Sequence, residues 1–352
     1  MLIVTPQLRS AAASRWLVSG FRSEHHLTGL IAFAFLLILL PQTLRAEPSL
    51  PLAIRNTAPA GLLFGVTPFR SEQRGLRIAI DNGNIFTGSN RRGVETVFDG
   101  ETTIATLSWN HVFKESGSGL WSIGIEAPWI RHGGGVLDGF IEGYHDTFGF
   151  PDGGRDRVPR DRLLYRIVEG GITRLHLDAS ARGIGDLRVR VGREFLAQPD
   201  RRFSIHGAIE LPTGEVDKIT GSGGTDVALW AEYRRTGLLG FERLGISAMA
   251  GGVVPGESEL LRGDPVDVIP IGHFGIQYRV SDRVELLAQT DGLGASYDIA
   301  SDVLGRAAVQ GTLGGRIRVW KSLWLDLAVV EDLVSDSTPD VIFHLSLGMR
   351  GQ

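Results

Sequence analysis

The most regular feature of the chain is an alternation of apolar and polar residues with a period of two. Between residues 121 and 129, Trp121, Ile125 and Trp129 fall on one face and Glu126 on the other. An extended chain turns alternate side chains to opposite faces, so the pattern predicts strands with one apolar and one polar face. Turn-forming stretches separate the runs. We expect strands at about 76–86, 102–113, 119–130, 162–178 (one or two strands), 184–195, 202–211, 225–235, 242–252, 268–280, 283–291, 306–319, 322–331 and 340–350.

Two folds share this alternation. A soluble sandwich turns its apolar faces inward, whereas a transmembrane barrel turns them to lipid and its polar faces to the lumen. Most runs are longer than the usual strand of about 5–6 residues and suit a tilted membrane crossing of about 9–11. Trp121 and Trp129 lie on one face, eight residues apart, which is about 26 Å along a strand. That spacing is typical of the two aromatic girdles of a membrane barrel.

The sequence therefore predicts an all-β fold, an antiparallel transmembrane β-barrel of about 12 strands (12–14). Barrels of this kind from bacterial outer membranes have an even number of strands. We expect twelve strands in the barrel. Because more than twelve runs are predicted, the run at 76–86 is the one whose place in the barrel is least supported.

An apolar run near the N-terminus predicts a targeting segment. Residues 27–40 are apolar and uncharged, three arginines precede them, and Ala46 follows at the position of a cleavage site. This is the pattern of a secretory signal peptide. The alternative is a membrane anchor, for which the run falls short of the roughly 20 residues that span a bilayer. We expect residues 1–46 to be a signal peptide and residues 47–352 a single barrel domain in the cell outer membrane.

Composition excludes several kinds of chemistry. The 352 residues contain 47 Gly and no Cys, and the formal net charge is −4. Without Cys there are no disulfides, thiolate metal sites or Cys nucleophiles. The chain has no basic stripe of the kind that binds phosphates, so we expect no nucleic-acid partner.

Residues 131–160 interrupt the alternation. Val136, Phe140 and Tyr144 recur at intervals of four, which predicts an amphipathic helix over about 136–148. We expect this insertion to plug the barrel or to lie on its rim, with its polar flank toward the lumen. Its candidate polar cluster is His132, Asp138, Glu142, His145, Asp146, Arg155 and Asp156.

Two chemical functions of that cluster, metal binding and acid–base catalysis, have less support than a plug or rim helix. Glu142 and His145 have the spacing of ligands on one helical face, but a di-metal site needs a second such pair and further carboxylates. The same two residues could serve in acid–base catalysis, yet no nucleophile motif accompanies them. We therefore expect no catalytic residues, no metal and no cofactor.

The polar faces of the predicted strands carry charges that would line the lumen. Opposite signs occur in similar numbers, so these side chains could pair with one another across the barrel. The candidate lumen-lining residues are Glu126, Arg188, Arg190, Glu232, Arg316, Arg318 and Asp326.

A set of short stretches carries a resemblance to a known family. These stretches are 98–102, 130–134, 138–146, 183–186, 211–214, 221–223, 331–333 and 339–340. They resemble an uncharacterised family of bacterial outer-membrane proteins, a domain of unknown function. The resemblance covers nearly all of the chain after the expected signal peptide, and it implies a Gram-negative outer-membrane β-barrel without implying an activity. Such barrels commonly end on an aromatic residue, whereas this chain ends on Gln352.

Three functions remain open at this stage. The first is a passive channel or transporter for small molecules, whose solute the sequence does not name. The second is an outer-membrane enzyme that acts on lipid or envelope polymer through Glu142 and His145. The third is a closed structural barrel. In each case the expected partners are outer-membrane lipid and the barrel insertion machinery.

Overall fold

Fifteen β-strands make up nearly all of the regular structure in the described part of the chain. The computed structural model describes residues 48–59, 75–114, 120–135, 159–259, 266–299, 303–334 and 338–349, together with Leu137, Gly139, Gly143 and Ser301. The strands are β1 (Gly75–Arg91), β2 (Val94–Lys114), β3 (Leu120–Gly133), β4 (Leu164–Glu169), β5 (Ile172–Leu177), β6 (Ala181–Ile184), β7 (Leu187–Gln198), β8 (Arg201–Leu211), β9 (Asp226–Leu238), β10 (Phe241–Val254), β11 (Ile269–Arg279), β12 (Val284–Leu293), β13 (Ala308–Trp320), β14 (Leu323–Val334) and β15 (Val341–Met349).

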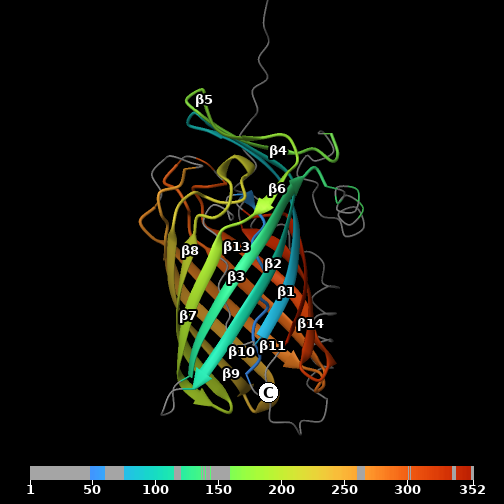
Figure 1. Cartoon of the computed structure of the whole chain (residues 1–352). Helices are drawn as coiled ribbons and strands as arrows, with labels where there is room; N and C mark the ends of the chain where they lie inside the picture. Colours follow the sequence, from blue (N-terminus) through green and yellow to red (C-terminus); the bar gives the residue numbers. More distant parts are fainter. Residues whose placement is uncertain are drawn as a thin grey trace, which may run out of the picture. The chain divides into compact units, whose positions relative to one another are not determined.

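Twelve of these strands close into an antiparallel barrel (Figure 1). Its wall runs through β1, β2 and β3 and then through β7 to β15 in chain order. The ring closes between the first and last strands, where Arg77 of β1 lies opposite Gly348 of β15 and Asn84 opposite Val341. The predicted fold class is confirmed, including the number of strands.

The run at 76–86 is confirmed as β1, which pairs with both neighbours along the wall. Another run that was expected among the barrel strands lies outside the wall. The run at 162–178 forms the hairpin β4–β5, which pairs with Val94–Asp99 of β2 outside the ring. Residues Gly170 and Gly171 make its turn with positive φ angles of 56° and 82°. Such a turn suits the twist of a two-residue hairpin, so this segment folds on itself and leaves the wall.

The two faces of the wall differ as a membrane barrel requires. On β3, Ile125 is 44% exposed and Trp129 39% exposed, whereas Glu126 between them is buried. The same contrast holds on β15, where Leu345 is exposed and His344 is buried. Apolar side chains thus cover the outside and polar side chains fill the inside, which is the reverse of a water-soluble protein. Among the described residues, no helix is long and apolar enough to cross a membrane.

The connections at the two ends of the barrel differ in length. At one end, two-residue turns such as Leu239–Gly240 and Lys321–Ser322 join neighbouring strands. At the other end, β8 connects to β9 through residues 212–225 and β3 connects to β7 through residues 134–186. We call these the turn end and the loop end. Outer-membrane barrels have short periplasmic turns and longer extracellular loops.

The helix expected at 136–148 is not confirmed. Of that range the structure describes Leu137, Gly139 and Gly143 alone. The backbone amide of Leu137 donates a hydrogen bond to the carboxylate of Glu101 on β2. The beginning of the insertion is therefore attached to the loop end of the wall.

A buried carboxylate joins three stretches of the chain at the loop end. Asp186, just before β7, accepts a hydrogen bond from the amide of Gly214 at 2.7 Å and another from the amide of Ser222 at 2.9 Å. A side chain on Gly221 would place its Cβ 2.4 Å from the Asp186 carboxylate. Three stretches that carried the family resemblance (183–186, 211–214 and 221–223) therefore meet at one point, and glycine is required there for close approach.

We expect Asp186→Asn to loosen this junction. In the variant, the side-chain amide nitrogen would face a backbone N–H that donates to a carboxylate oxygen in the wild-type protein. A buried polar group left without a partner costs about 1–3 kcal/mol. Limited proteolysis of the folded protein should then cut residues 212–224 several-fold faster. Asp217, exposed on the short 3-10 helix Val216–Lys218 in the same loop, is the matched control. Equal proteolysis of Asp186→Asn and Asp217→Asn would contradict this role.

Candidate functional site in the barrel lumen

The lumen contains a segment of the chain that is not part of the wall. Residues 48–57 precede β1 and have neither helix nor strand structure, yet most of their side chains are buried. We call residues 48–58 the lumen segment. Proline at positions 48 and 51 keeps the neighbouring residues out of helical conformations. The sequence analysis did not predict this feature.

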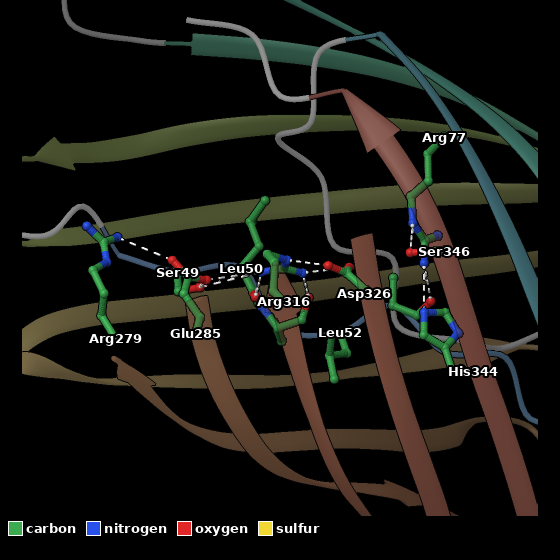
Figure 2. Close-up of polar contacts among 12 residues, drawn as sticks. Ser49, Leu50, Leu52, Arg77, Arg279, Glu285, Arg316, Asp326, His344 and Ser346 are labelled. Carbon is green, nitrogen blue, oxygen red and sulfur yellow. Dashed lines mark hydrogen bonds and ion pairs between the residues drawn. The ribbon is translucent and has the colours of Figure 1, made fainter. Parts of the chain in front are cut away.

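Side chains of the wall bind the backbone of the lumen segment. Gln289 of β12 accepts a hydrogen bond from the amide of Leu52 at 3.0 Å and donates one to the carbonyl of the same residue at 3.2 Å. Arg316 of β13 donates to the carbonyl of Leu50 at 2.6 Å. Figure 2 shows Arg316 between Leu50 and Asp326.

Further contacts extend this backbone recognition toward both ends of the segment. Arg234 of β9 donates to the carbonyl of Pro48 at 3.1 Å. Arg77 of β1 donates to the carbonyl of Ala53 at 2.8 Å. A strand in a sheet would satisfy these carbonyls with a neighbouring backbone, whereas here four separate strands supply side chains for the same purpose.

The side chains of the lumen segment make specific contacts as well. The Ser49 hydroxyl donates to Glu285 at 2.5 Å. Leu52 is fully buried in a small apolar cluster with Leu287 and Ala328. Arg55 forms an ion pair with Glu126 of β3 at 3.3 Å.

A small cavity lies beside the lumen segment. It has a volume of about 40 Å³ and is lined by Ile54, Arg55 and Asn56 from the segment and by Asp291 and Gln310 from the wall. A cavity of that size holds about one or two water molecules.

Ion pairs join neighbouring strands of the inner wall. Arg316 binds Asp326 of β14 through two hydrogen bonds, at 2.6 and 2.9 Å, and lies 3.7 Å from Glu285. Arg188 of β7 pairs with Glu210 of β8. Buried charges that are paired in this way cross-link the wall, and the removal of one partner leaves the other charge uncompensated.

Most of the predicted lumen-lining residues lie inside the barrel. Arg190 is 3.8 Å from Glu126, and Glu232 is 3.1 Å from Arg234. Arg318 is less buried and stacks over the ring of Trp324, with 5.7 Å between its guanidinium and the ring centroid. The other six residues are buried, namely Glu126, Arg188, Arg190, Glu232, Arg316 and Asp326.

Of the predicted polar cluster, the structure describes His132. Its Nδ1 lies 2.8 Å from the hydroxyl of Thr102, and its Nε2 lies 2.9 Å from the carbonyl of Ile219. Thr102 also contacts the hydroxyl of Tyr165 on β4, whose pKa is raised by burial. His132 thus ties the wall to the loop end. The other members, Asp138, Glu142, His145, Asp146, Arg155 and Asp156, lie outside the described residues.

No metal centre is apparent in the part of the chain that the structure describes, where no three His, Asp or Glu side chains are grouped to hold an ion. Toward the loop end, the lumen segment meets a buried apolar cluster. The cluster includes Phe98, Tyr165, Trp230 and Tyr297, and Ala58 at the end of the lumen segment belongs to it.

Comparison with known proteins gives a family and a fold. The family model described as "Protein of unknown function (DUF3187)" matches residues 27–350. No curated protein matches the sequence. Among solved structures, an outer membrane channel from Pseudomonas putida F1 has a TM-score of 0.55 at 13% identity, over 80% of this chain and 97% of the other. The Pseudomonas putida toluene transporter TodX has a TM-score of 0.38 at 10% identity, over 87% of this chain and 98% of the other. The first of these similarities shows a shared fold.

Proposed function

The chain belongs to the DUF3187 family of proteins of unknown function, and we propose that it is a passive channel for small molecules in the outer membrane, closed at rest by the lumen segment. The main support for this proposal comes from the part of the chain that lies inside the lumen. A separate segment occupies it, and wall side chains hold that segment by hydrogen bonds to its backbone. Such contacts can be made and broken without unfolding the wall.

Three further features support the proposal. The outer face is apolar over the strands, which fits a lipid environment. The short turns and long loops are divided between the two ends as in outer-membrane barrels. The fold is similar to that of an outer membrane channel from Pseudomonas putida F1. A signal peptide over residues 1–46 would deliver the chain to that membrane.

The absence of cysteine allows the lumen segment to be fixed in place by one disulfide. A Cβ built on Gly83 of β1 would lie 3.2 Å from the Cβ of Thr57, so a shift of a few tenths of an ångström would bring the pair into the range of about 3.5–4.5 Å found in disulfides. The variant Thr57→Cys/Gly83→Cys should therefore form a bond between segment and wall under oxidising conditions. Thr57→Cys alone is the matched control.

The test combines this bond with a cut in the chain. A protease site is introduced between residues 60 and 74, which join the lumen segment to β1 in the sequence. A short linker keeps a tethered segment at an effective concentration of the order of mM near its site. Cutting the linker removes this effect, so the segment can leave. We expect the cut and reduced barrel to give sustained conductance in planar bilayers, and the cut and oxidised barrel to stay closed.

The outcomes separate the proposal from its alternative. If the cut and reduced barrel conducts and oxidation abolishes the current, the lumen segment is a removable closure. A sealed bilayer after cutting, reduction and loss of the segment would favour the closed structural barrel, for which the paired charges of the inner wall provide a reason. The control Thr57→Cys should conduct after cutting under both redox conditions.

A further inference from the structure

We infer that the lumen is a binding site for unfolded oligopeptides, and that the lumen segment is its resident ligand. This inference names a ligand class for the channel proposed above, although peptide binding can be measured whether or not the barrel conducts. The lumen segment is the chain's own occupant of a site whose contacts would also suit other peptides.

The first argument is the chemistry of the wall groups. Gln289 both accepts from the amide and donates to the carbonyl of Leu52, a pairing that matches the donor and acceptor of one peptide residue. Together Arg77, Gln289, Arg316 and Arg234 contact six backbone groups between Pro48 and Ala53, and these contacts are made to atoms that every peptide possesses.

The second argument is selectivity for the side chains of the peptide. The Leu52 side chain fills the apolar cluster with Leu287 and Ala328. Arg55, three residues later, pairs with Glu126 at 3.3 Å, and both side chains are largely buried. A buried ion pair is favourable when both partners are present and costly when one is missing. The site should therefore prefer peptides with an apolar residue followed, three positions later, by arginine.

The direction of the segment also fits a peptide path. Its first contacts are with Arg234 and Glu285, on strands whose two-residue and four-residue connections form the turn end. Ala58, at its other end, reaches the apolar cluster toward the loop end. The groups that bind the backbone are thus distributed along the lumen. An extended, chain-like ligand requires this distribution.

The experiment uses the full-length protein with the protease site between residues 60 and 74, cut and then washed to release the segment. Three fluorescent peptides are the probes. The first has the sequence of residues 47–60, and the second keeps Pro48, Pro51, Leu52 and Arg55 but has unrelated residues at the other positions. The third equals the first with glutamate in place of the arginine. Binding is measured by fluorescence anisotropy, and block of conductance is measured in parallel.

We expect the first two peptides to bind within about tenfold of each other, because most contacts are to the backbone. The third should bind at least about tenfold more weakly, which corresponds to about 1.4 kcal/mol. Glu126→Gln in the barrel should remove most of that difference, since neither peptide then meets a buried carboxylate at this position. Gln289→Leu should weaken all three peptides in parallel.

Failure of this inference is distinguishable from failure of the channel. If the cut barrel conducts but the second peptide neither binds nor blocks, the lumen recognises its own segment alone and the peptide site is wrong. If the cut barrel is sealed, anisotropy still decides whether peptides bind. Binding of the second peptide that is unaffected by Gln289→Leu would also overturn the inference, because the site would then lie elsewhere.

Discussion

Arg316→Met should lower the free energy of unfolding by about 3–5 kcal/mol, the range found when one partner of a buried ion pair is removed. Arg316 is 1% exposed and binds both oxygens of Asp326. Without the guanidinium, the buried carboxylates of Asp326 and Glu285 lose the cation that they share, and the carbonyl of Leu50 loses its donor. The variant should therefore weaken both the wall and its hold on the lumen segment.

The measurement is urea unfolding in detergent micelles, followed by Trp fluorescence and by the shift of the compact band in unboiled gels. Arg318→Met, two residues along the same strand, is the matched control because Arg318 is less buried and stacks on Trp324. We expect the control to lose about 1 kcal/mol or less. Equal losses for the two variants would show that the Arg316 ion pairs do not stabilise the barrel.

Ile125→Arg should be almost as damaging, although Ile125 is on the outside. The residue is 44% exposed and lies on β3 midway between Trp121 and Trp129, whose spacing in the sequence led us to expect the two aromatic girdles there. Arginine on the lipid face near the bilayer midplane costs about 2–4 kcal/mol. An exposed surface position in a water-soluble protein would tolerate the same change within about 0.5 kcal/mol.

This prediction is tested by folding into lipid vesicles, with the folded fraction measured by heat-modifiable migration as urea is varied. Ile125→Leu keeps the apolar surface and should fold like the wild-type protein. Glu126→Gln, at the next residue but on the inner face, reports lumen effects separately. If Ile125→Arg folds as stably as Ile125→Leu, the outward face does not meet hydrocarbon and the membrane orientation of the strands is wrong.

The fold could be predicted from the sequence because every wall strand has the same local requirement. A strand between lipid and lumen needs an apolar residue at every second position, and residues 121–129 and 341–349 satisfy this requirement over their whole length. The hairpin β4–β5 has a similar pattern, so periodicity alone could not separate it from the wall. The pair Gly170–Gly171, which has φ angles suited to a tight hairpin turn, was the available signal.

The lumen segment could not be predicted in the same way. Residues 48–58 alternate only at Leu50, Leu52 and Ile54, which is too short a run to predict a membrane crossing, and Pro51 interrupts it. The backbone of this segment is bound by side chains and not by a neighbouring strand, and the sequence of the segment does not show this. The partners on the wall were visible as charged residues, and Arg316 and Glu126 were among the predicted lumen residues. Their ligand within the chain became apparent only from the contacts.

The position of the lumen segment constrains how the protein is assembled. The segment precedes the first strand, yet the ring around it is completed by β15, the last strand, through the seam that joins Arg77 to Gly348 and Asn84 to Val341. The earliest residues of the barrel domain are thus enclosed by the latest ones. Biogenesis must either close the seam around a chain already lying inside, or draw the segment in afterwards through the turn end. The second route requires that whatever precedes Pro48 be small enough to follow, and cleavage of the signal peptide proposed for residues 1–46 would meet that requirement.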